Sequence, residues 1–437
     1  MNFTNFINYF SYLCKMKKAV AFHTLGCKLN FAESSDLGRK FVEDGYELVD
    51  FKTVADVYVI NTCTVTALAE KKCRTAIRQA IRQNPNAKIA VVGCFSQVSP
   101  DEIAKIEGVD YVLGNADKHR LLEYLVGAGS ARPDGNCDKY LQMGRANPAP
   151  TGTDFVVAYS ADDRTRTFLK IQDGCDYFCT YCAIPHARGR NRNDSIENTL
   201  KIVEKIAKSD TKEIVLTGIN IGEFGKSTNE TFFQLIQALD QIQGIERYRI
   251  SSIEPNLISD EIVDFVAKSR AFLPHFHIPL QSGSNKILQL MKRRYTRELF
   301  AERVQKIKTA MPHAFIAADV IVGFPGETDE NFENMYQFIE SLPLTFLHIF
   351  PYSERPNTPA INLPEKVSAE VKKQRSERLH ELSEKKHADF CKNHRLNPSK
   401  VLWEADNHNG WLYGFTENYI RVRKPFDQNS VNKTEEF

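Results

Sequence analysis

The sequence lacks the features that mark membrane and exported proteins. No apolar run reaches the roughly 18 residues that a membrane-spanning helix requires. The first fifteen residues are rich in aromatic side chains, but they contain neither a basic start nor a cleavage site of small residues. We therefore expect residues 1–16 to be a tail, and we expect a cytoplasmic protein without a membrane partner.

The sequence also has almost no net charge and no visible internal repeat. Its 57 Lys and Arg residues against 55 Asp and Glu give a net charge of +2, so any RNA site has to be a local basic patch. The length of 437 residues suggests two to four domains. Ten cysteines in a cytosolic chain are more typical of metal ligands or free thiols than of disulfides.

The N-terminal part of the chain alternates apolar strands with amphipathic helices, which predicts an open, mostly parallel α/β sheet over residues 17–128. Each predicted strand ends in a cysteine. The carboxyl ends of the strands form the ligand crevice in such sheets, so we expect Cys27, Cys63 and Cys94 to converge there. The predicted strands are Ala19–Cys27, Asp56–Cys63 and Lys88–Cys94.

The helix expected after Cys63 carries a basic stripe. Arg74, Arg78 and Arg82 recur at every fourth position, and Cys73 belongs to the adjacent apolar face. A solvated face is favoured over an RNA contact by about two to one. Cys73 is expected to be a packed thiol and not a ligand.

Residues 129–160 lose periodicity and predict a linker, after which strands and helices alternate again over residues 161–375. Six βα units predict a partial (β/α)6 barrel of the TIM type, with the active site at the C-terminal ends of the strands. Asp194 and Glu197 predict the start of one helix. The predicted strands are Thr167–Gln172, Glu213–Thr217, Tyr248–Ile253, Phe276–Leu280, Phe315–Val322 and Phe346–Phe350.

The last part of the chain, residues 376–437, predicts a small β module behind a polar helix at Lys366–Asn393. The polar stretch Asp427–Glu436 follows where such a module would need further strands to close. Three short strands are predicted, at Lys400–Ala405, Gly410–Phe415 and Tyr419–Lys424.

The strongest chemical motif is the loop that carries Cys175, Cys179 and Cys182 just after the first barrel strand. Thiolates are soft ligands that suit iron–sulfur clusters, and three of them leave one iron of a [4Fe–4S] cluster open to a substrate. The alternative is a structural zinc site with His186 as the fourth ligand, which the spacing alone does not exclude.

This loop on a partial barrel resembles the radical S-adenosylmethionine (SAM) superfamily. The resemblance continues over nearly the whole chain and, with the N-terminal cysteines, points to the methylthiotransferase family. The segments that carry it are Leu216–Asn220, Arg249–Glu254, His277–Gly283, Asp319–Thr328 and Phe350–Ser353.

The resemblance implies two [4Fe–4S] clusters, one held by Cys175, Cys179 and Cys182 and a second by Cys27, Cys63 and Cys94. SAM on the open iron of the first yields a 5′-deoxyadenosyl radical, and the second carries the sulfur to be methylated and transferred. The implied cofactor-binding residues are Tyr181, Gly218, Ser251, Glu254, Gln281 and Gly323.

Several of these residues also have a physical interpretation of their own. Gly218 and Gly323 allow close approach of a ligand to the backbone, and Ser251 and Glu254 suit hydrogen bonds to ribose. For His275 and His277, on one predicted strand, a structural role is favoured over proton transfer.

The sequence around the N-terminal cysteines resembles the branch that acts on N6-threonylcarbamoyladenosine at position 37 of tRNA. Arg355 is the candidate for binding the substrate carboxylate. The Asn at position 357, where the family often has Gly, is expected to change little, because Asn tolerates a left-handed backbone. The alternatives are isopentenyladenosine in tRNA, a ribosomal-protein residue, or a non-catalytic metal-containing RNA-binding protein.

The C-terminal module resembles the TRAM domain, a small RNA-binding barrel. Tyr419, Arg421 and Arg423 are then expected to contact the nucleic acid by stacking and phosphate binding, with a solvated β-turn as the alternative. The implied partners are a tRNA anticodon stem-loop and an electron donor such as flavodoxin or ferredoxin.

Overall fold

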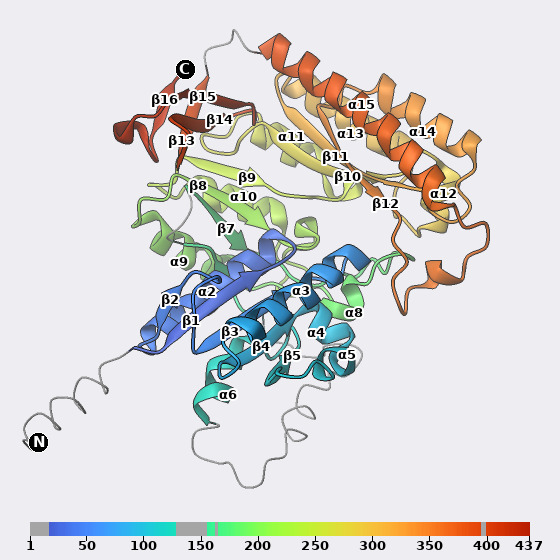
Figure 1. Cartoon of the computed structure of the whole chain (residues 1–437). Helices are drawn as coiled ribbons and strands as arrows, with labels where there is room; N and C mark the ends of the chain where they lie inside the picture. The colour runs from blue at the N-terminus through green and yellow to red at the C-terminus, as the bar shows by residue number, and fades with distance from the viewer. Residues whose placement is uncertain (1–16, 128–154, 162–164, 395–398) are drawn as a thin grey trace, which may run out of the picture. The chain divides into compact units, whose positions relative to one another are not determined.

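The computed structural model describes residues 17–127, 155–161, 165–394 and 399–437. It divides into two compact units, Met1–Gly152 with His186–Arg188, and Thr153–Pro185 with Gly189–Phe437 (Figure 1). The predicted tail and residues 129–154 of the predicted linker lie outside the described residues, and the last part of that linker contains a short strand at Ala158–Tyr159. Within the described part of the chain, no helix is both long and apolar enough to cross a membrane.

The first unit is built on a five-stranded parallel sheet with the order β2-β1-β3-β4-β5, which confirms the predicted open parallel sheet. Its three central strands were predicted. The two edge strands, with three residues each, are too short to show a strand period in the sequence. The strands are β1 (Ala19–Thr24), β2 (Glu47–Val49), β3 (Val57–Thr62), β4 (Lys88–Gly93) and β5 (Tyr111–Leu113).

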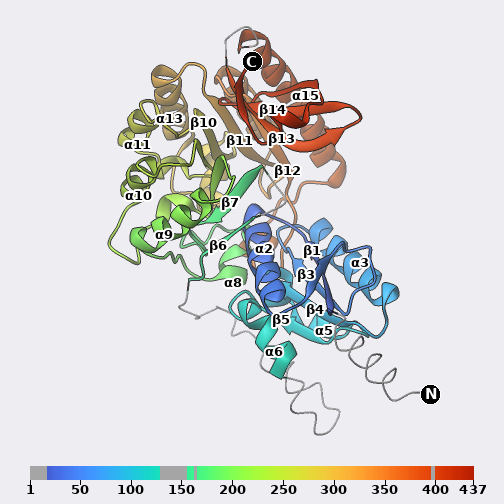
Figure 2. The same cartoon turned by 90° about the vertical axis from the view of Figure 1, so that its left-hand side faces the viewer.

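Helices cover both faces of this sheet (Figure 2). Tyr58 and Ile60 of β3 pack with Ile77 of α3 on one face, and Val59 packs with Phe41 of α2 on the other. Burial on both faces explains why the central strands are continuously apolar. The helices are α2 (Lys28–Glu43), α3 (Ala67–Gln83), α4 (Cys94–Val98), α5 (Pro100–Ala104) and α6 (Leu121–Gly127).

The second unit contains six parallel strands in chain order, as predicted for the partial barrel. Strands β7, β8 and β9 form one sheet, edged by β6 (Ala158–Tyr159), and β10, β11 and β12 form another. A parallel bridge between Ser252 and His277 joins the two. The strands are β7 (Arg166–Lys170), β8 (Glu213–Thr217), β9 (Arg247–Ile250), β10 (His275–Gln281), β11 (Phe315–Val322) and β12 (Phe346–Pro351).

One hydrophobic cluster fills the layer between these strands and their helices, with Leu216, Ile278 and Val320 among its fully buried members. The predicted start of α9 was wrong by one residue. The cap is Ser195, whose hydroxyl accepts a hydrogen bond from Asn198, while the Asp194 carboxylate accepts one from the Ser195 amide. The helices are α9 (Ile196–Ala207), α10 (Phe232–Asp240), α11 (Asp260–Val266), α12 (Asn285–Leu290), α13 (Arg297–Ala310) and α14 (Asp329–Ser341). The short helix α8 (Ile184–Arg188) belongs to both units, since His186–Arg188 are part of the first.

The long helix α15 (Ala369–His394) packs on the barrel, where the Ser383 hydroxyl accepts a hydrogen bond of 3.0 Å from the Leu347 amide. A curled antiparallel sheet follows, in the order β15-β14-β13-β16. The sequence predicted three of its strands. The fourth lies in the polar stretch, because an edge strand paired only with β13 needs few apolar residues. The strands are β13 (Lys400–His408), β14 (Trp411–Thr416), β15 (Arg421–Pro425) and β16 (Thr434–Glu436).

Two candidate cysteine centres and a basic aromatic surface

Three cysteines of the first unit lie at the carboxyl edge of its sheet. Cys27 immediately precedes α2, Cys63 follows β3, and Cys94 begins α4. The preceding strands β1, β3 and β4 are neighbours in the sheet. The three cysteines therefore lie at one edge of the sheet, as the sequence predicted, although each comes after its strand and not at the strand end itself.

Two glycines shape these turns. Gly26 has φ +100° and Gly93 has φ +99°, a backbone region that side chains rarely adopt. A Cβ on Gly26 would lie 2.8 Å from the sulfur of Cys63, and one on Gly93 would lie 2.5 Å from the Asn61 side-chain oxygen. Glycine is thus required for the close approach of the cysteine turns.

Buried amide side chains connect the turns. Asn30 Nδ2 donates to the carbonyl oxygens of Leu25 at 2.6 Å and Thr62 at 3.0 Å, which ties the first two cysteine turns together. Asn115 Nδ2 donates to the sulfur of Cys94 at 3.5 Å. The Asn30 bonds hold two of the turns together, and the Asn115 bond contacts the sulfur of Cys94 directly.

A buried carboxylate with two cations lies in the same unit. Glu33 accepts hydrogen bonds from Lys118 Nζ at 2.5 Å and from Arg188 Nη2 at 3.1 Å, and all three side chains are fully buried. Burial raises the pKa of the Cys27 thiol, and the Arg188 guanidinium acts against this rise. The excess positive charge favours bound thiolates over thiols.

Cys63, Cys73 and Cys94 are buried residues, whereas Cys27 is exposed. Burial, with the neighbouring Cys94 and Cys27, raises the pKa of Cys63 to about 12. Cys73 accepts a hydrogen bond of 3.5 Å from the Cys63 amide, as expected of a packed thiol. Thiols with such pKa values stay protonated and inert unless a metal ion binds them, so this edge suits a metal cluster.

The cysteine loop of the second unit follows β7. Before it, Gly174 has φ +69°, and a Cβ there would lie 1.9 Å from the carbonyl oxygen of Arg190. The Cys175 amide donates to the Gly189 carbonyl at 3.0 Å. Burial raises the pKa of Cys182 to about 12, and the neighbouring Cys179 makes the next largest contribution to this rise. The backbone is thus held tightly where the first thiol projects.

Two distant segments hold the other end of this loop. Thr180 donates through its amide to Met291 at 3.1 Å and through its hydroxyl to Leu290 at 2.8 Å. Its carbonyl accepts from the Ala360 amide at 2.9 Å. The loop therefore depends on the folded barrel for its shape.

Arg293 is a site residue that the sequence analysis missed. It donates to the sulfur of Cys179 at 3.1 Å and to the hydroxyl of Tyr181 at 3.3 Å, and it pairs with Glu254. Burial raises the pKa of Glu254, and Arg293 acts against that rise. In the sequence, Arg293 is marked only by a run of basic residues, Lys292–Arg294, between α12 and α13. This run lies outside the segments that carry the family resemblance.

The predicted cofactor-binding residues gather at the carboxyl edge of the barrel strands. Gly218 follows β8, Ser251 follows β9, Gln281 ends β10 and Gly323 follows β11, while Tyr181 lies in the cysteine loop. This is the edge where a TIM-type barrel binds ligands.

Two of the glycines here also serve the protein's own packing. A Cβ on Gly218 would lie 2.7 Å from the side-chain oxygen of Gln172, which accepts a hydrogen bond from the Ile219 amide. The Gly323 amide donates to the Glu327 carboxylate at 2.8 Å. At these two positions the glycine backbone lies close to other atoms of the protein, and the same lack of a side chain leaves room for a ligand.

The C-terminal sheet separates the residues that were predicted to bind RNA. Tyr419 stacks on Phe415 with ring centroids 4.7 Å apart, and the Arg249 guanidinium of the barrel lies 4.5 Å from its ring. Its hydroxyl accepts from Arg166 at 3.5 Å. The ring is thus held between Phe415 and the barrel, and stacking of Tyr419 on a base stays a prediction.

Arg421 and Arg423 are instead exposed on β15. The Arg421 guanidinium lies 4.2 Å from the ring of Tyr413, and that of Arg423 lies 4.4 Å from the ring of Trp411 on β14. The sheet thus presents a basic aromatic surface made of these four residues.

Arg355, the predicted carboxylate ligand, follows β12 and is buried, with 4% of its surface exposed. Asn357 in the same segment has φ +63°. This confirms that Asn adopts the left-handed backbone expected there.

Two family matches and several relatives agree with this division. Residues 19–114 match a family described as Uncharacterized protein family UPF0004, and residues 169–339 match the Radical SAM superfamily. The solved structure of TsrM from Kitasatospora setae, a radical S-adenosylmethionine methyltransferase, superposes with a TM-score of 0.61 at 16% identity. It covers 79% of this chain and 75% of that chain, which shows the shared fold.

Curated relatives are closer in sequence. The threonylcarbamoyladenosine tRNA methylthiotransferase MtaB of Bacillus subtilis is 44% identical over 92% of this chain and 89% of its own. The MtaB of Aquifex aeolicus is 40% identical over 93% and 96%. The tRNA-2-methylthio-N(6)-dimethylallyladenosine synthase of Clostridium tetani is 32% identical over 88% and 85%.

The cofactors predicted from the sequence agree with these matches. Radical SAM enzymes use S-adenosylmethionine and a [4Fe–4S] cluster, and methylthiotransferases carry a second cluster. With a relative this similar over nearly the full length of both chains, the chain belongs to the family of threonylcarbamoyladenosine tRNA methylthiotransferases.

Proposed function

We propose that this enzyme attaches a methylthio group to C2 of N6-threonylcarbamoyladenosine at position 37 of tRNA, in the cytoplasm. One observation carries the proposal: each unit gathers three cysteines at the carboxyl edge of its parallel strands. A relative 44% identical over 92% of the chain is named for this substrate, while relatives named for dimethylallyladenosine reach 30–34%.

Cys175, Cys179 and Cys182 are assigned to the SAM-binding cluster, and Cys27, Cys63 and Cys94 to the auxiliary cluster. When bound, the clusters and SAM supply radical and sulfur-transfer chemistry. The chain supplies placement, because rigid glycine turns and buried amides direct the sulfurs of the first unit. Arg293 puts a positive charge against Cys179, which stabilises the thiolate form that iron requires.

The remaining cofactor contacts are assigned to groups at the barrel edge. Tyr181, Gly218, Ser251, Gln281 and Gly323 line the carboxyl edge of successive strands. Glu254 adds a carboxylate for hydroxyl groups of the ligand, and its pairing with Arg293 orients it. Arg355, a buried cation after the last strand, is assigned to the substrate carboxylate.

The anticodon stem-loop is assigned to the basic aromatic surface of Trp411, Tyr413, Arg421 and Arg423. Exposed arginines over aromatic rings suit both phosphate contacts and base stacking. Tyr419 is left out of this surface, because it packs on the barrel. The electron needed for SAM cleavage is assigned to a small donor such as flavodoxin or ferredoxin.

The test of the substrate uses two anticodon stem-loops that differ only at N6 of the target adenosine. Each is incubated with the reconstituted enzyme, reductant and SAM, and the nucleosides are measured by mass spectrometry. Methylthiolation is expected with the threonylcarbamoyl substrate and near background with the isopentenyl one. A site that hydrogen-bonds a polar group rejects an analogue without it by up to about 10⁴-fold.

Equal or reversed turnover of the two substrates would overturn the substrate assignment. Arg355→Lys is the matched variant, since it keeps a charge but not the fork that binds a carboxylate. It is expected to raise KM for the threonylcarbamoyl substrate. Analysis of iron and inorganic sulfide, with about eight of each per chain expected, separates this enzyme from a zinc-containing RNA-binding protein.

A further inference from the structure

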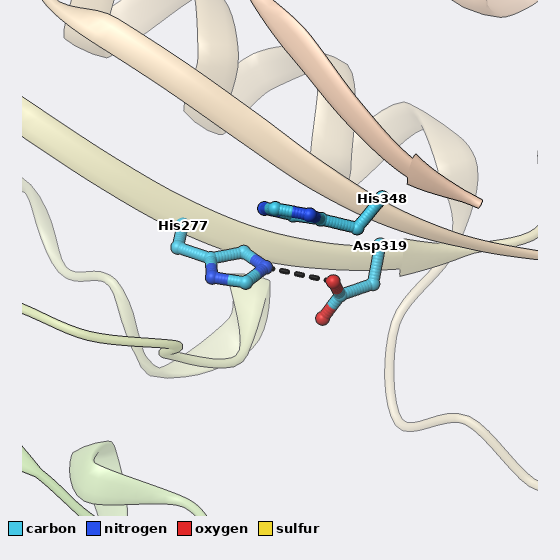
Figure 3. A group of neighbouring side chains, drawn as sticks. All are labelled: His277, Asp319 and His348. Carbon is cyan, nitrogen blue, oxygen red and sulfur yellow. Dashed lines mark hydrogen bonds and ion pairs between the residues drawn. The ribbon is translucent and has the colours of Figure 1, made fainter. Parts of the chain in front are cut away.

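Two histidines and an aspartate meet on three neighbouring strands of the barrel. His277 lies on β10, Asp319 on β11 and His348 on β12. Asp319 and His348 are register partners, and His277 pairs with Ala317, two residues before Asp319. The three side chains therefore project from one face of the β10-β11-β12 sheet, as Figure 3 shows.

This face points away from the surrounding helices. The residues next to them along the strands, Ile278, Val320 and Leu347, point to the other face and are buried in the hydrophobic cluster between strands and helices. Side chains alternate along a strand, so the three polar residues face the barrel interior. His277 and Asp319 keep 21% and 19% of their side chains exposed, which leaves the group accessible to an ion.

The ligand atoms of the group converge. One nitrogen of each imidazole and one carboxylate oxygen all lie within 4.8 Å of one another. His277 Nε2 is 2.7 Å from Asp319 Oδ1, and the rings of His277 and His348 have centroids 4.8 Å apart with a tilt of 37°. In the described part of the chain, no other trio of His, Cys, Asp or Glu converges in this way.

Two imidazoles and one carboxylate are the ligand set of many Zn²⁺ and non-haem Fe²⁺ sites, which keep open coordination positions. The His277–Asp319 hydrogen bond fits the structural role expected for His277 from the sequence. His348 packs against the rings of His277 and Phe346, and its imidazole completes a set of two imidazoles and one carboxylate.

We propose that His277, Asp319 and His348 bind one divalent transition-metal ion of the Zn²⁺ or Fe²⁺ class, with its remaining positions open to the barrel interior. The site is separate from the two cysteine centres, and its occupancy does not depend on which base the enzyme modifies. Water or an oxygen atom of a substrate suits the open positions.

The site lies within electrostatic reach of the SAM-binding residues. Burial raises the pKa of Glu254, and the negative charge of Asp319 adds to that rise. Glu254 in turn pairs with Arg293, which contacts Cys179. A bound cation at Asp319 would therefore act on the same electrostatic network.

The experiment uses the holoenzyme with both clusters reconstituted and Zn²⁺ as the probe. Zinc and iron are counted per chain after dialysis, and zinc X-ray absorption identifies the ligands. We expect about one zinc per chain, with nitrogen and oxygen neighbours near 2.0–2.1 Å and no sulfur near 2.3 Å. A wild-type enzyme that retains neither zinc nor iron beyond the roughly eight cluster atoms, or zinc with sulfur neighbours, overturns the proposal.

Two variants sharpen the test. His348→Ala removes a ligand and leaves the His277–Asp319 pair, while Asp319→Asn keeps an acceptor for His277 but removes the charge. Loss of a residue that only supports a metal ligand costs about 10- to 100-fold in metal affinity. His348 and Asp319 are proposed to bind the ion directly, so each variant should bind zinc at least about 100-fold more weakly. The exposed His380→Ala on α15 is the matched control and should bind zinc normally. Equal zinc affinity in the wild type and both variants refutes the site.

Discussion

The two cysteine centres differ in how the chain assembles them. Cys175, Cys179 and Cys182 lie within one loop, whereas Cys27, Cys63 and Cys94 come from three turns far apart in the sequence. The loop is held by hydrogen bonds to distant segments, such as those of Thr180. Cys27, Cys63 and Cys94 instead lie shortly after strands of the first unit's sheet, among buried amide and charged side chains.

This difference shows two ways to build a three-thiolate site. A loop needs a short sequence and one rigid anchor at each end. A sheet edge needs several glycine turns and a buried polar network, and in return each thiolate is fixed by its own strand. The centres belong to different units, so each should survive damage to the other.

The largest expected effect is on the loop centre. Replacing Cys175, Cys179 and Cys182 together by Ala should abolish cleavage of SAM, because no thiolate remains to hold that cluster. The auxiliary cluster should remain, so the iron content should fall to about half of the roughly eight atoms expected. Anaerobic reconstitution, iron analysis and measurement of 5′-deoxyadenosine check this, and full iron with full cleavage would contradict it.

The reciprocal change tests the other half of the comparison. Replacing Cys27, Cys63 and Cys94 by Ala should leave formation of 5′-deoxyadenosine and remove the methylthio product. Cys73→Ala is the matched control, because that thiol is packed beside Cys63 and should not be a ligand. Product formed at the wild-type rate by the triple variant would mean that these cysteines are only packing residues.

A smaller effect is expected from the buried charges of the first unit. Glu33→Gln leaves Lys118 and Arg188 buried without a full countercharge, which costs on the order of 3–5 kcal/mol. Thermal unfolding should begin at a lower temperature and the auxiliary cluster should become labile, while SAM cleavage persists. The exposed Glu43→Gln on the same helix is the control, and equal melting of the two variants would count against the network.

The corresponding change near the loop centre should cost less. Arg293→Gln removes the donor to Cys179 and leaves Glu254 without its cation, at a cost of about 3 kcal/mol for this largely buried pair. SAM cleavage should slow and the unfolding temperature should fall. Adding Glu254→Gln should recover part of the stability, and no recovery would indicate that the pair is not coupled.

The smallest effect concerns the C-terminal sheet. Replacing Arg421 and Arg423 by Ala should weaken tRNA binding at all sequences and reduce the salt dependence of log Kd by about 1.5, since two phosphate contacts are lost. Tyr419→Ala should lower the unfolding temperature and leave this salt dependence unchanged. A salt dependence that falls only in Tyr419→Ala would reverse the assignment of the two surfaces.

The sequence by itself determined the fold class and the six cysteines. Buried parallel strands produce continuous apolar runs, and a loop motif with short spacing is visible without any structure. The predicted strands of both α/β units are therefore confirmed. The short edge strands β2, β5 and β16 were missed, because three residues carry too little periodicity.

Only the tertiary structure decided which residues from distant segments meet. Arg293 reaches Cys179 across more than a hundred residues, and Tyr419 packs on the barrel although its neighbours Arg421 and Arg423 are exposed. His277, Asp319 and His348 converge because the register of three parallel strands places them side by side. Local patterns fix which face of a strand or helix is buried, but the pairing register and the loops between elements decide which side chains share a site.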